Sequence, residues 1–198
     1  GKFTFFIFSL IPVQTLFVWN ILVLPQYVQR AFEGTWLGKN FEAATAFNSL
    51  LIFILCPVVA ALSAKAKVYR MMILGTAVMG LSPFLLVAGG DTAPAMVAYI
   101  LVLSIGEAMW QPRFLQLAAE IAPEGRTGVY MGVAQLPWFL TKALVPLYSG
   151  AAMAAWCPAE GPRSTTTLWL VSGCIALVST TLLVLAKGWV GRDFRTRA

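Results

Sequence analysis

The stretch LSIGEAMWQPRFLQ, residues 103–116, decides the fold because it places a carboxylate, Glu107, among small and apolar residues. Hydrophobic residues make up 59% of the 198-residue chain, charged residues make up 11%, and the mean hydropathy is +0.79. So few ionisable groups cannot cover a soluble domain of this length. The composition therefore indicates an integral membrane protein, in which Glu107 is surrounded by hydrocarbon or by protein.

Six apolar segments are each long enough to cross a hydrocarbon core of roughly 30 Å as a helix that rises about 1.5 Å per residue. Stretches rich in turn and helix-capping residues, such as AGGDTAP and APEGRTG, separate them. The sequence therefore predicts an all-α membrane protein that forms one transmembrane domain over residues 1–198. The six predicted helices span about 3–28, 42–64, 68–88, 94–121, 127–156 and 165–187.

Basic residues are distributed unevenly between the two sides of the membrane that these helices predict. An even number of crossings puts both termini on one side, and by the positive-inside rule the more basic side is cytoplasmic, or stromal or matrix in an organelle. This asymmetry explains most of the net charge of +6, so we predict no nucleic-acid binding. The side of the termini holds Lys2, Lys65, Lys67, Arg70, Arg126, Lys187, Arg192, Arg195 and Arg197. The opposite loops hold Arg30, Lys39 and Arg163.

The residue types that most enzymes and metal centres require are scarce in this chain. It has no His, the usual ligand of haem iron and catalytic zinc and the general base of Ser-His and Cys-His mechanisms. The three cysteines, Cys56, Cys157 and Cys174, show no paired spacing, and we predict no disulfide. We therefore predict no cofactor, no metal and no enzymatic activity.

Two charged residues lie at the midpoints of predicted membrane helices, Glu107 in the fourth and Lys142 in the fifth. A charge near the bilayer centre costs at least about 2.5 to 3.5 kcal/mol, so such residues usually face a bundle interior or a wet cavity and often pair. Ser104, Glu107 and Gln111 follow i, i+3, i+7 spacing and form one polar stripe. We expect Glu107 and Lys142 at similar depth on neighbouring helices, as a functional site or, alternatively, as a static ion pair that sets helix register.

Several polar, Gly and Pro positions resemble a known family of transporters. GEAMWQP, residues 106–112, resembles the tenth-helix motif of the proton-dependent oligopeptide transporter family, within the major facilitator superfamily. APEGRTGVYMG, residues 122–132, keeps that family's loop spacing, and FNSLLIFILCP, residues 47–57, resembles its eighth helix. WFLT at 138–141, followed by SG at 149–150, is similar to the eleventh helix.

This resemblance implies that the six segments are helices seven to twelve, the C-terminal half of a major facilitator superfamily bundle. It implies that Glu107 takes part in recognition of the substrate amino group and in proton coupling, and that Asn48 and Trp138 line the substrate cavity. Two positions depart from the family pattern. Ser49 stands where Pro is usual, and Lys142 is a charge that the motif does not contain.

Two functions remain open at the level of the sequence. The first is proton-coupled transport of small peptides or similar solutes, in which the partners are the lipid bilayer, a proton, a solute and a second six-helix half. That half would come from the same chain, a homodimer or another subunit, and the chain, which begins at Gly1 without Met, is either processed or part of something longer. The second is a non-transporting structural subunit of a larger membrane complex, with aromatic-rich apolar faces that pack on partner helices.

Overall fold

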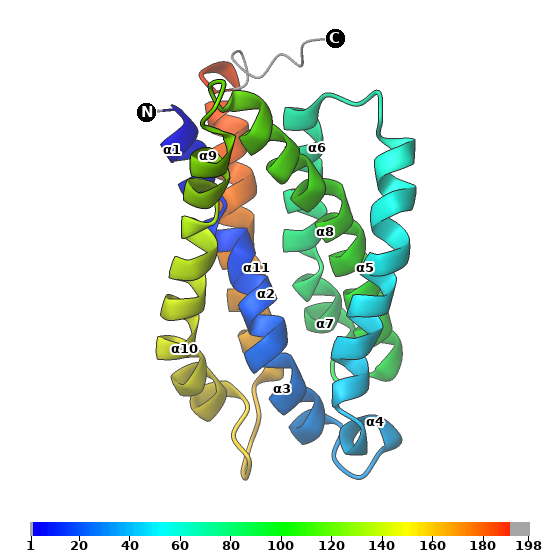
Figure 1. The fold of residues 1–198 in the computed structure, drawn as a ribbon. Coiled ribbons are helices and arrows are strands. Elements are labelled where there is room, and N and C mark those ends of the chain that lie inside the picture. The colour runs from blue at the N-terminus through cyan, green and yellow to red at the C-terminus, as the bar shows by residue number, and fades with distance from the viewer. Residues whose placement is uncertain (1, 191–198) are drawn as a thin grey trace.

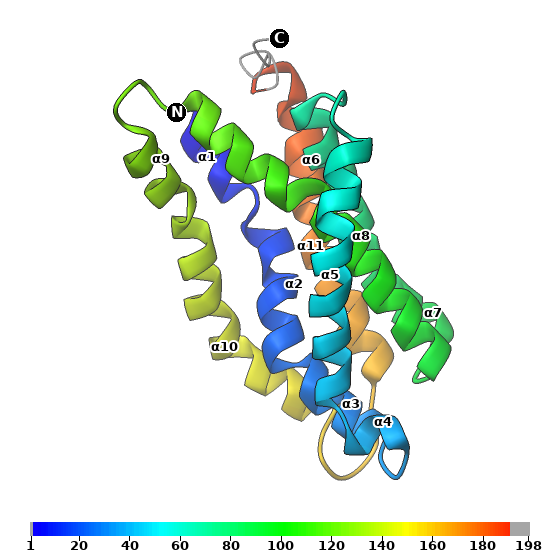
Figure 2. The same ribbon diagram turned by 45° about the vertical axis from the view of Figure 1, so that its right-hand side comes forward.

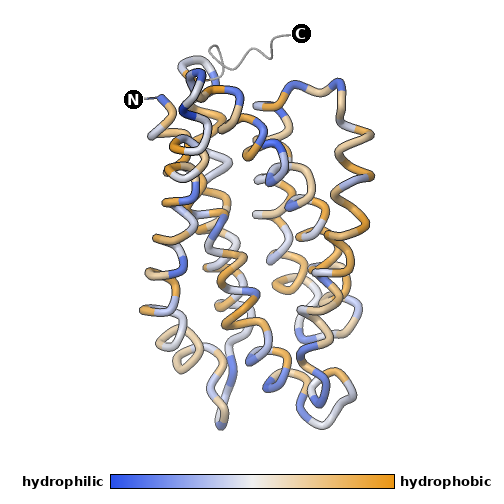
Figure 3. Tube along the Cα trace, in the orientation of Figure 1, coloured by the Kyte–Doolittle hydropathy of each residue, from blue (hydrophilic) through white to orange (hydrophobic). Residues whose placement is uncertain are grey.

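A computed structural model of the chain describes residues 2–190. These residues form helices joined by short loops, without a strand, so the predicted all-α class is confirmed. Figure 1 shows most helices running along the length of one bundle, with α1 and the end of α11 at the same end. Figure 3 shows hydrophilic residues gathered mainly at the two ends of this bundle.

The helices follow one another as α1 (Lys2–Phe8), α2 (Ile11–Leu22), α3 (Leu24–Ala31), α4 (Trp36–Lys39), α5 (Glu42–Leu62), α6 (Val68–Leu81), α7 (Pro83–Gly89), α8 (Ala93–Ile121), α9 (Thr127–Ala134), α10 (Leu136–Trp156) and α11 (Thr165–Leu185). A short 3-10 helix, η1 (Ala186–Gly188), follows α11.

Proline explains why three of the predicted segments are divided into consecutive helices. A proline has no N–H group and its ring collides with the carbonyl four residues earlier, so it is tolerated best in the first turn of a helix. Four prolines occupy the first or second position of a new helix at such breaks, in α2, α3, α7 and α10. They are Pro12, Pro25, Pro83 and Pro137.

Five helical stretches of the described chain are long and apolar enough to cross a membrane. They are Lys2–Leu22, Glu42–Leu62, Val68–Gly89, Ala93–Ile121 and Thr165–Gly188. The predicted fifth span, 127–156, is helical, but it is not among them. Lys142 and several polar residues within α10 lower its hydropathy. The count of six crossings therefore stays a prediction.

The packing order of the helices differs from their order in the chain. α8 packs between α5 and α6, α11 packs on α6, α7 and α2, and α10 packs on α2. Figures 1 and 2 show α5 alongside α8 and α10 on the far side of α2. As a result α5 has one buried residue, Ala44, whereas α8 contributes the largest buried set of any helix.

Glycines permit the closest helix contacts in the bundle. A Cβ on Gly75 would lie 2.8 Å from the Cβ of Trp110 and 3.0 Å from the Gly106 oxygen, and a Cβ on Gly106 would collide with the Met79 backbone. Gly80 meets Leu177 in the same way on α11. Small residues let membrane helices approach until their backbones touch, and here they fix α6 against both α8 and α11.

Buried hydroxyl groups tie segments that are far apart in sequence at the end of the bundle opposite the termini. Tyr27 donates a hydrogen bond of 2.6 Å to Asp91, and Thr165 donates one of 3.0 Å to the other oxygen of the same carboxylate. About two turns deeper, Tyr99 donates to the side-chain oxygen of Asn20 at 2.6 Å. These contacts join α3, the α7–α8 loop, α11, α8 and α2 while satisfying the polar groups of buried tyrosines.

Candidate functional site

Glu107 lies in the middle of α8 and is 8% exposed. Its neighbour Gly106 packs on the backbone of Met79, which places this turn of α8 at the closest contact with α6. The Oε2 atom of Glu107 is buried and has no hydrogen-bond partner, and no ion pair reaches this carboxylate within residues 2–190. Burying an ionised carboxylate without a cation nearby costs folding free energy. A carboxylate at this place in the bundle therefore indicates a functional role.

Two further residues predicted for the site lie beside Glu107. Asn48, on α5, donates a hydrogen bond of 2.8 Å from its amide nitrogen to the Ser104 hydroxyl. Ser104, buried on α8 one turn before Glu107, donates its own proton to the Ile100 carbonyl at 2.7 Å. The structure therefore brings Asn48, Ser104 and Glu107 together where α5 packs on α8.

Gln111 continues the polar stripe of α8 one turn beyond Glu107, but its side chain is exposed. The stripe that the spacing predicts thus runs from an exposed amide through the buried carboxylate to the buried Ser104 hydroxyl. This arrangement gives Glu107 a polar neighbour that is accessible from outside the bundle.

Lys142 does not join this cluster. It is exposed on α10, and its ammonium group lies 4.6 Å from the centroid of the Trp138 ring, in cation–π contact with the residue one turn earlier. α10 packs mainly on α2, whereas α8 packs on α5 and α6. The expectation that Glu107 and Lys142 lie on neighbouring helices is therefore wrong. The described ion pairs do not join the two charges.

Trp138 is half-buried and connects α10 to α8 through aromatic contacts. Its ring meets Phe17 of α2 edge-on, with 5.6 Å between centroids, and Phe17 lies 5.9 Å from the ring of Trp110 on α8. The indole N–H of Trp110 points to the Met79 sulfur at 3.2 Å. Lys142, Trp138, Phe17 and Trp110 therefore form a continuous series that ends three residues from Glu107.

Sequence reasoning missed the burial of Gln14 and the hydrogen-bond partner of Arg113. Gln14, on α2, is buried and its side-chain oxygen has no hydrogen-bond partner in the described part of the chain. The signal was available, since a glutamine inside the apolar run IPVQTLF is unusual. Arg113 donates to the Ser63 carbonyl at 2.7 Å and to its hydroxyl at 3.0 Å, which caps the end of α5. That contact depends on tertiary packing and has no signature in either segment alone.

The sequence model of the family described as the Major Facilitator Superfamily matches residues 3–146, from α1 into α10. Comparisons with curated proteins and with solved structures gave no significant match. The described residues contain no group of three or more His, Cys, Asp or Glu side chains that could hold a metal ion.

Proposed function

Because this chain belongs to the Major Facilitator Superfamily, we propose that it is one half of a twelve-helix carrier that couples proton movement to the transport of small peptides or similar solutes. The family and the five apolar helices indicate an integral, multi-pass membrane protein of the transporter type. Assignment to the C-terminal half, and to peptide-like solutes, is supported by the motif around Glu107. In such carriers the substrate binds near the bilayer midplane between two repeats that move against each other.

The buried, uncompensated carboxylate of Glu107 is the observation that carries this proposal. A carboxylate in low-dielectric surroundings needs a positive charge nearby, and none of the described side chains supplies one by an ion pair. A proton or the ammonium group of a solute can fill that role. Protonation of Glu107 removes the cost of the buried charge, so the protonated and the ionised carrier favour different conformations, and this difference is the basis of coupling.

The surrounding residues suit this role for Glu107. Asn48 and Ser104 hold a polar hydrogen-bonded pair beside the carboxylate, and exposed Gln111 provides a polar approach from the same helix face. Lys142 carries the opposite charge on α10, where it is exposed and held over Trp138. A zwitterionic solute offers an ammonium group for Glu107 and a carboxylate for Lys142, which favours peptides and amino-acid-like solutes.

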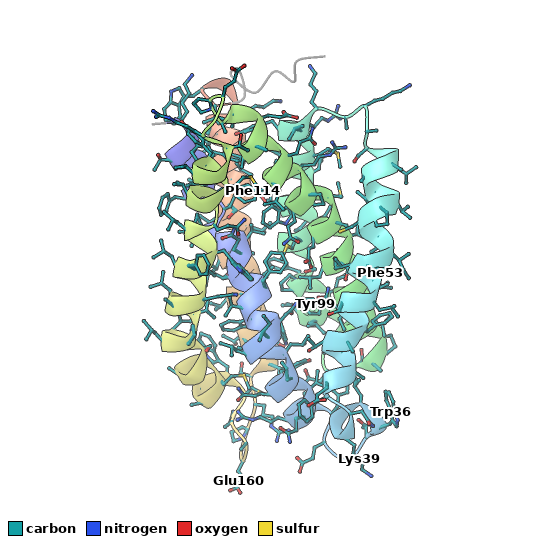
Figure 4. All side chains as sticks on the ribbon, viewed as in Figure 1. Trp36, Lys39, Phe53, Tyr99, Phe114 and Glu160 are labelled. Atoms are coloured by element: carbon teal, nitrogen blue, oxygen red, sulfur yellow. The ribbon has the colours of Figure 1, made fainter. Side chains whose placement is uncertain are left out.

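The proposal includes a second six-helix half because large apolar side chains remain exposed on α5 and α10. Phe53, labelled in Figure 4, is 81% exposed, and the neighbouring exposed positions of α5 are also aliphatic. Lipid covers part of such a surface in a membrane protein, and a second six-helix half covers the part that faces the substrate. That half comes from the same chain, from a second copy or from another subunit. We further expect the termini on the cytoplasmic side, in keeping with the distribution of basic residues.

A structural role in a larger membrane complex is the second candidate function, and the exposed apolar face of α5 is the observation that favours it. A scaffold helix that packs on partner helices would show the same exposure. The two candidates differ in what they require of Glu107. A carrier needs a protonatable group at this position, whereas a scaffold needs only a side chain that fills the same volume.

Uptake by proteoliposomes distinguishes these functions. The chain, with its second half where a subunit co-purifies, is reconstituted and tested for uptake of a radiolabelled dipeptide under an imposed inward proton gradient. We expect Glu107→Gln to abolish gradient-driven uptake and to retain exchange of dipeptide across the membrane. Glu124→Gln is the matched control, because Glu124 is an exposed loop carboxylate. Gradient-driven uptake that survives in Glu107→Gln refutes the coupling role, and wild-type protein without any uptake supports the scaffold.

A further inference from the structure

A cavity of about 550 Å³ lies at the end of the bundle opposite the termini, between α3, α4 and the loop that joins α10 to α11. Figure 4 labels Lys39 and Glu160 at this end. The cavity is separate from Glu107 and its neighbours, none of which lines it. Its polar and aromatic lining is made by Gln29, Arg30, Glu33, Lys39, Phe41 and Arg163.

The basic residues of this end converge on the cavity. The sequence places only Arg30, Lys39 and Arg163 in the loops on this side of the predicted membrane, and all three line it. They come from three segments of the chain, so no local sequence pattern brings them together. The positive-inside rule explains why this side has few basic residues, but it does not explain why those few gather at one cavity.

The charges of the lining do not balance. Among the described residues, Glu33 is the one carboxylate that lines the cavity. It lies 3.6 Å from the Arg163 guanidinium, and its own side chain is 80% exposed. Neither Arg30 nor Lys39 is joined to a carboxylate by an ion pair among residues 2–190. Three cations against one carboxylate leave the lining with two uncompensated positive charges, which favours an anion in the cavity.

The two guanidinium groups are held in fixed positions by the backbone. Arg30 donates from Nη1 to the Cys157 carbonyl at 2.5 Å, and Arg163 donates from Nη1 to the Arg30 carbonyl at 2.5 Å and from Nε to the Pro158 carbonyl at 3.2 Å. Carbonyl groups satisfy individual N–H groups but do not neutralise the charge. Arg30 also donates from Nη2 to the Gln26 side-chain oxygen at 3.4 Å, and Arg163 donates from Nη2 to the Ala159 carbonyl at 3.0 Å. Because a guanidinium has five N–H donors, Arg30 retains most of its donors for a ligand, whereas Arg163, which also pairs with Glu33, retains fewer.

We propose that this cavity binds a phosphate group, presented by an anionic lipid headgroup or by a soluble phosphate ester. The planar guanidinium matches two phosphate oxygens at once, and the Lys39 ammonium adds a mobile point charge beside it. Trp36, three residues before Lys39 on α4, is 70% exposed, as is typical of tryptophans at the level of lipid headgroups. We expect the cavity at the level of the lipid phosphates, because it lies just beyond the start of the apolar helix Glu42–Leu62.

The test titrates the purified chain in neutral detergent with phosphatidylglycerol, phosphatidylcholine or glycerol 3-phosphate and follows the shift in unfolding temperature by tryptophan fluorescence. We expect phosphatidylglycerol to bind the wild type more tightly than phosphatidylcholine. Glycerol 3-phosphate that protects the wild type as well identifies a soluble ester as a ligand, whereas protection by the lipid alone identifies the headgroup. Equal apparent affinity for both lipids, with no effect of glycerol 3-phosphate, overturns the proposal.

Three variants locate the binding. Lys39→Gln removes a charge without removing a described structural contact, and we expect it to weaken binding by roughly threefold to tenfold. Arg30→Gln should weaken it by about tenfold or more, since it also loses the bidentate geometry. Lys67→Gln, at the other end of the bundle, is the matched control and should bind as the wild type does. Wild-type affinity in Lys39→Gln overturns the assignment, and this variant remains informative if Arg30→Gln fails to fold.

Discussion

Replacing Gly106 by alanine should weaken the packing of α8 on α6 and disturb the position of Glu107, the next residue. The added Cβ would collide with the Met79 amide nitrogen and would lie 2.7 Å from the Met79 Cα. Ordinary van der Waals contact begins at 3.4 Å, so the backbone of α6 would have to withdraw by at least 0.7 Å at that point. A backbone cannot rotate away as the tip of a side chain can, and the cost of the collision falls on the whole helix pair.

The magnitude follows from two opposing effects. Overpacking a close contact costs about 1 to 3 kcal/mol, and contact with backbone places this site at the upper end of that range. Alanine in place of glycine within a helix returns about 1 kcal/mol through its better helix propensity. We therefore expect Gly106→Ala to lower the free energy of unfolding by about 2 kcal/mol, and Gly106→Val to lower it further.

Reversible unfolding by SDS in mixed micelles, followed by tryptophan fluorescence, measures this loss. Gly150→Ala is the matched control, because a Cβ on Gly150, within α10, would have no atom within 4 Å. The control should be as stable as the wild type or more stable by up to about 1 kcal/mol. A Gly106→Ala variant within about 0.5 kcal/mol of the wild type would refute the close contact of α6 and α8.

Three other predictions test the topology and the polar contacts. Single cysteines at Lys67 and Glu160, in a background without the native cysteines, should react with an impermeant reagent from opposite faces of sealed vesicles; labelling from one face contradicts the predicted crossings. Arg113→Met should lower the free energy of unfolding by about 1.5 to 3 kcal/mol, since it loses the charged hydrogen bonds to Ser63, and Arg113→Lys should lose less. Equal stability of these two variants would argue against that contact. Burial raises the pKa of the Cys157 thiol, with two nearby guanidinium groups opposing it, so less thiolate is present at pH 8. Alkylation by iodoacetamide should therefore be slower in the folded chain than in SDS, and equal rates would show an accessible thiol.

Much of the architecture follows from composition and hydropathy. A backbone in hydrocarbon must satisfy its own hydrogen bonds, so long apolar segments are helical whatever their neighbours are. The segment predicted at 42–64 is α5, Glu42–Leu62, and the one predicted at 94–121 is α8, Ala93–Ile121. The burial of Glu107 was predictable for a related reason, because the cost of a charge in lipid leaves few other places for a carboxylate in mid-helix.

The same reasoning did not place Lys142. A charge at the midpoint of a helix is expected to turn inward, yet Lys142 is exposed and lies over Trp138 on its own helix. The position of a residue along a membrane helix sets its expected depth. The rotation of the helix about its axis sets the direction in which the side chain points. That rotation depends on which helix α10 packs against, and α10 packs on α2.

The sequence by itself determined the membrane environment and the helical segments, because these depend on local hydropathy and on backbone hydrogen bonding. Only the tertiary structure decided which side chains meet. Between membrane helices, apolar faces have little preference for one another over lipid, and partners are selected by close-packed small residues and a few polar contacts. The contact of Arg113 with Ser63 and the meeting of Arg30 with Arg163 around one cavity join residues from distant segments. They exist only once α8 has packed on α5 and the α10–α11 loop on α3.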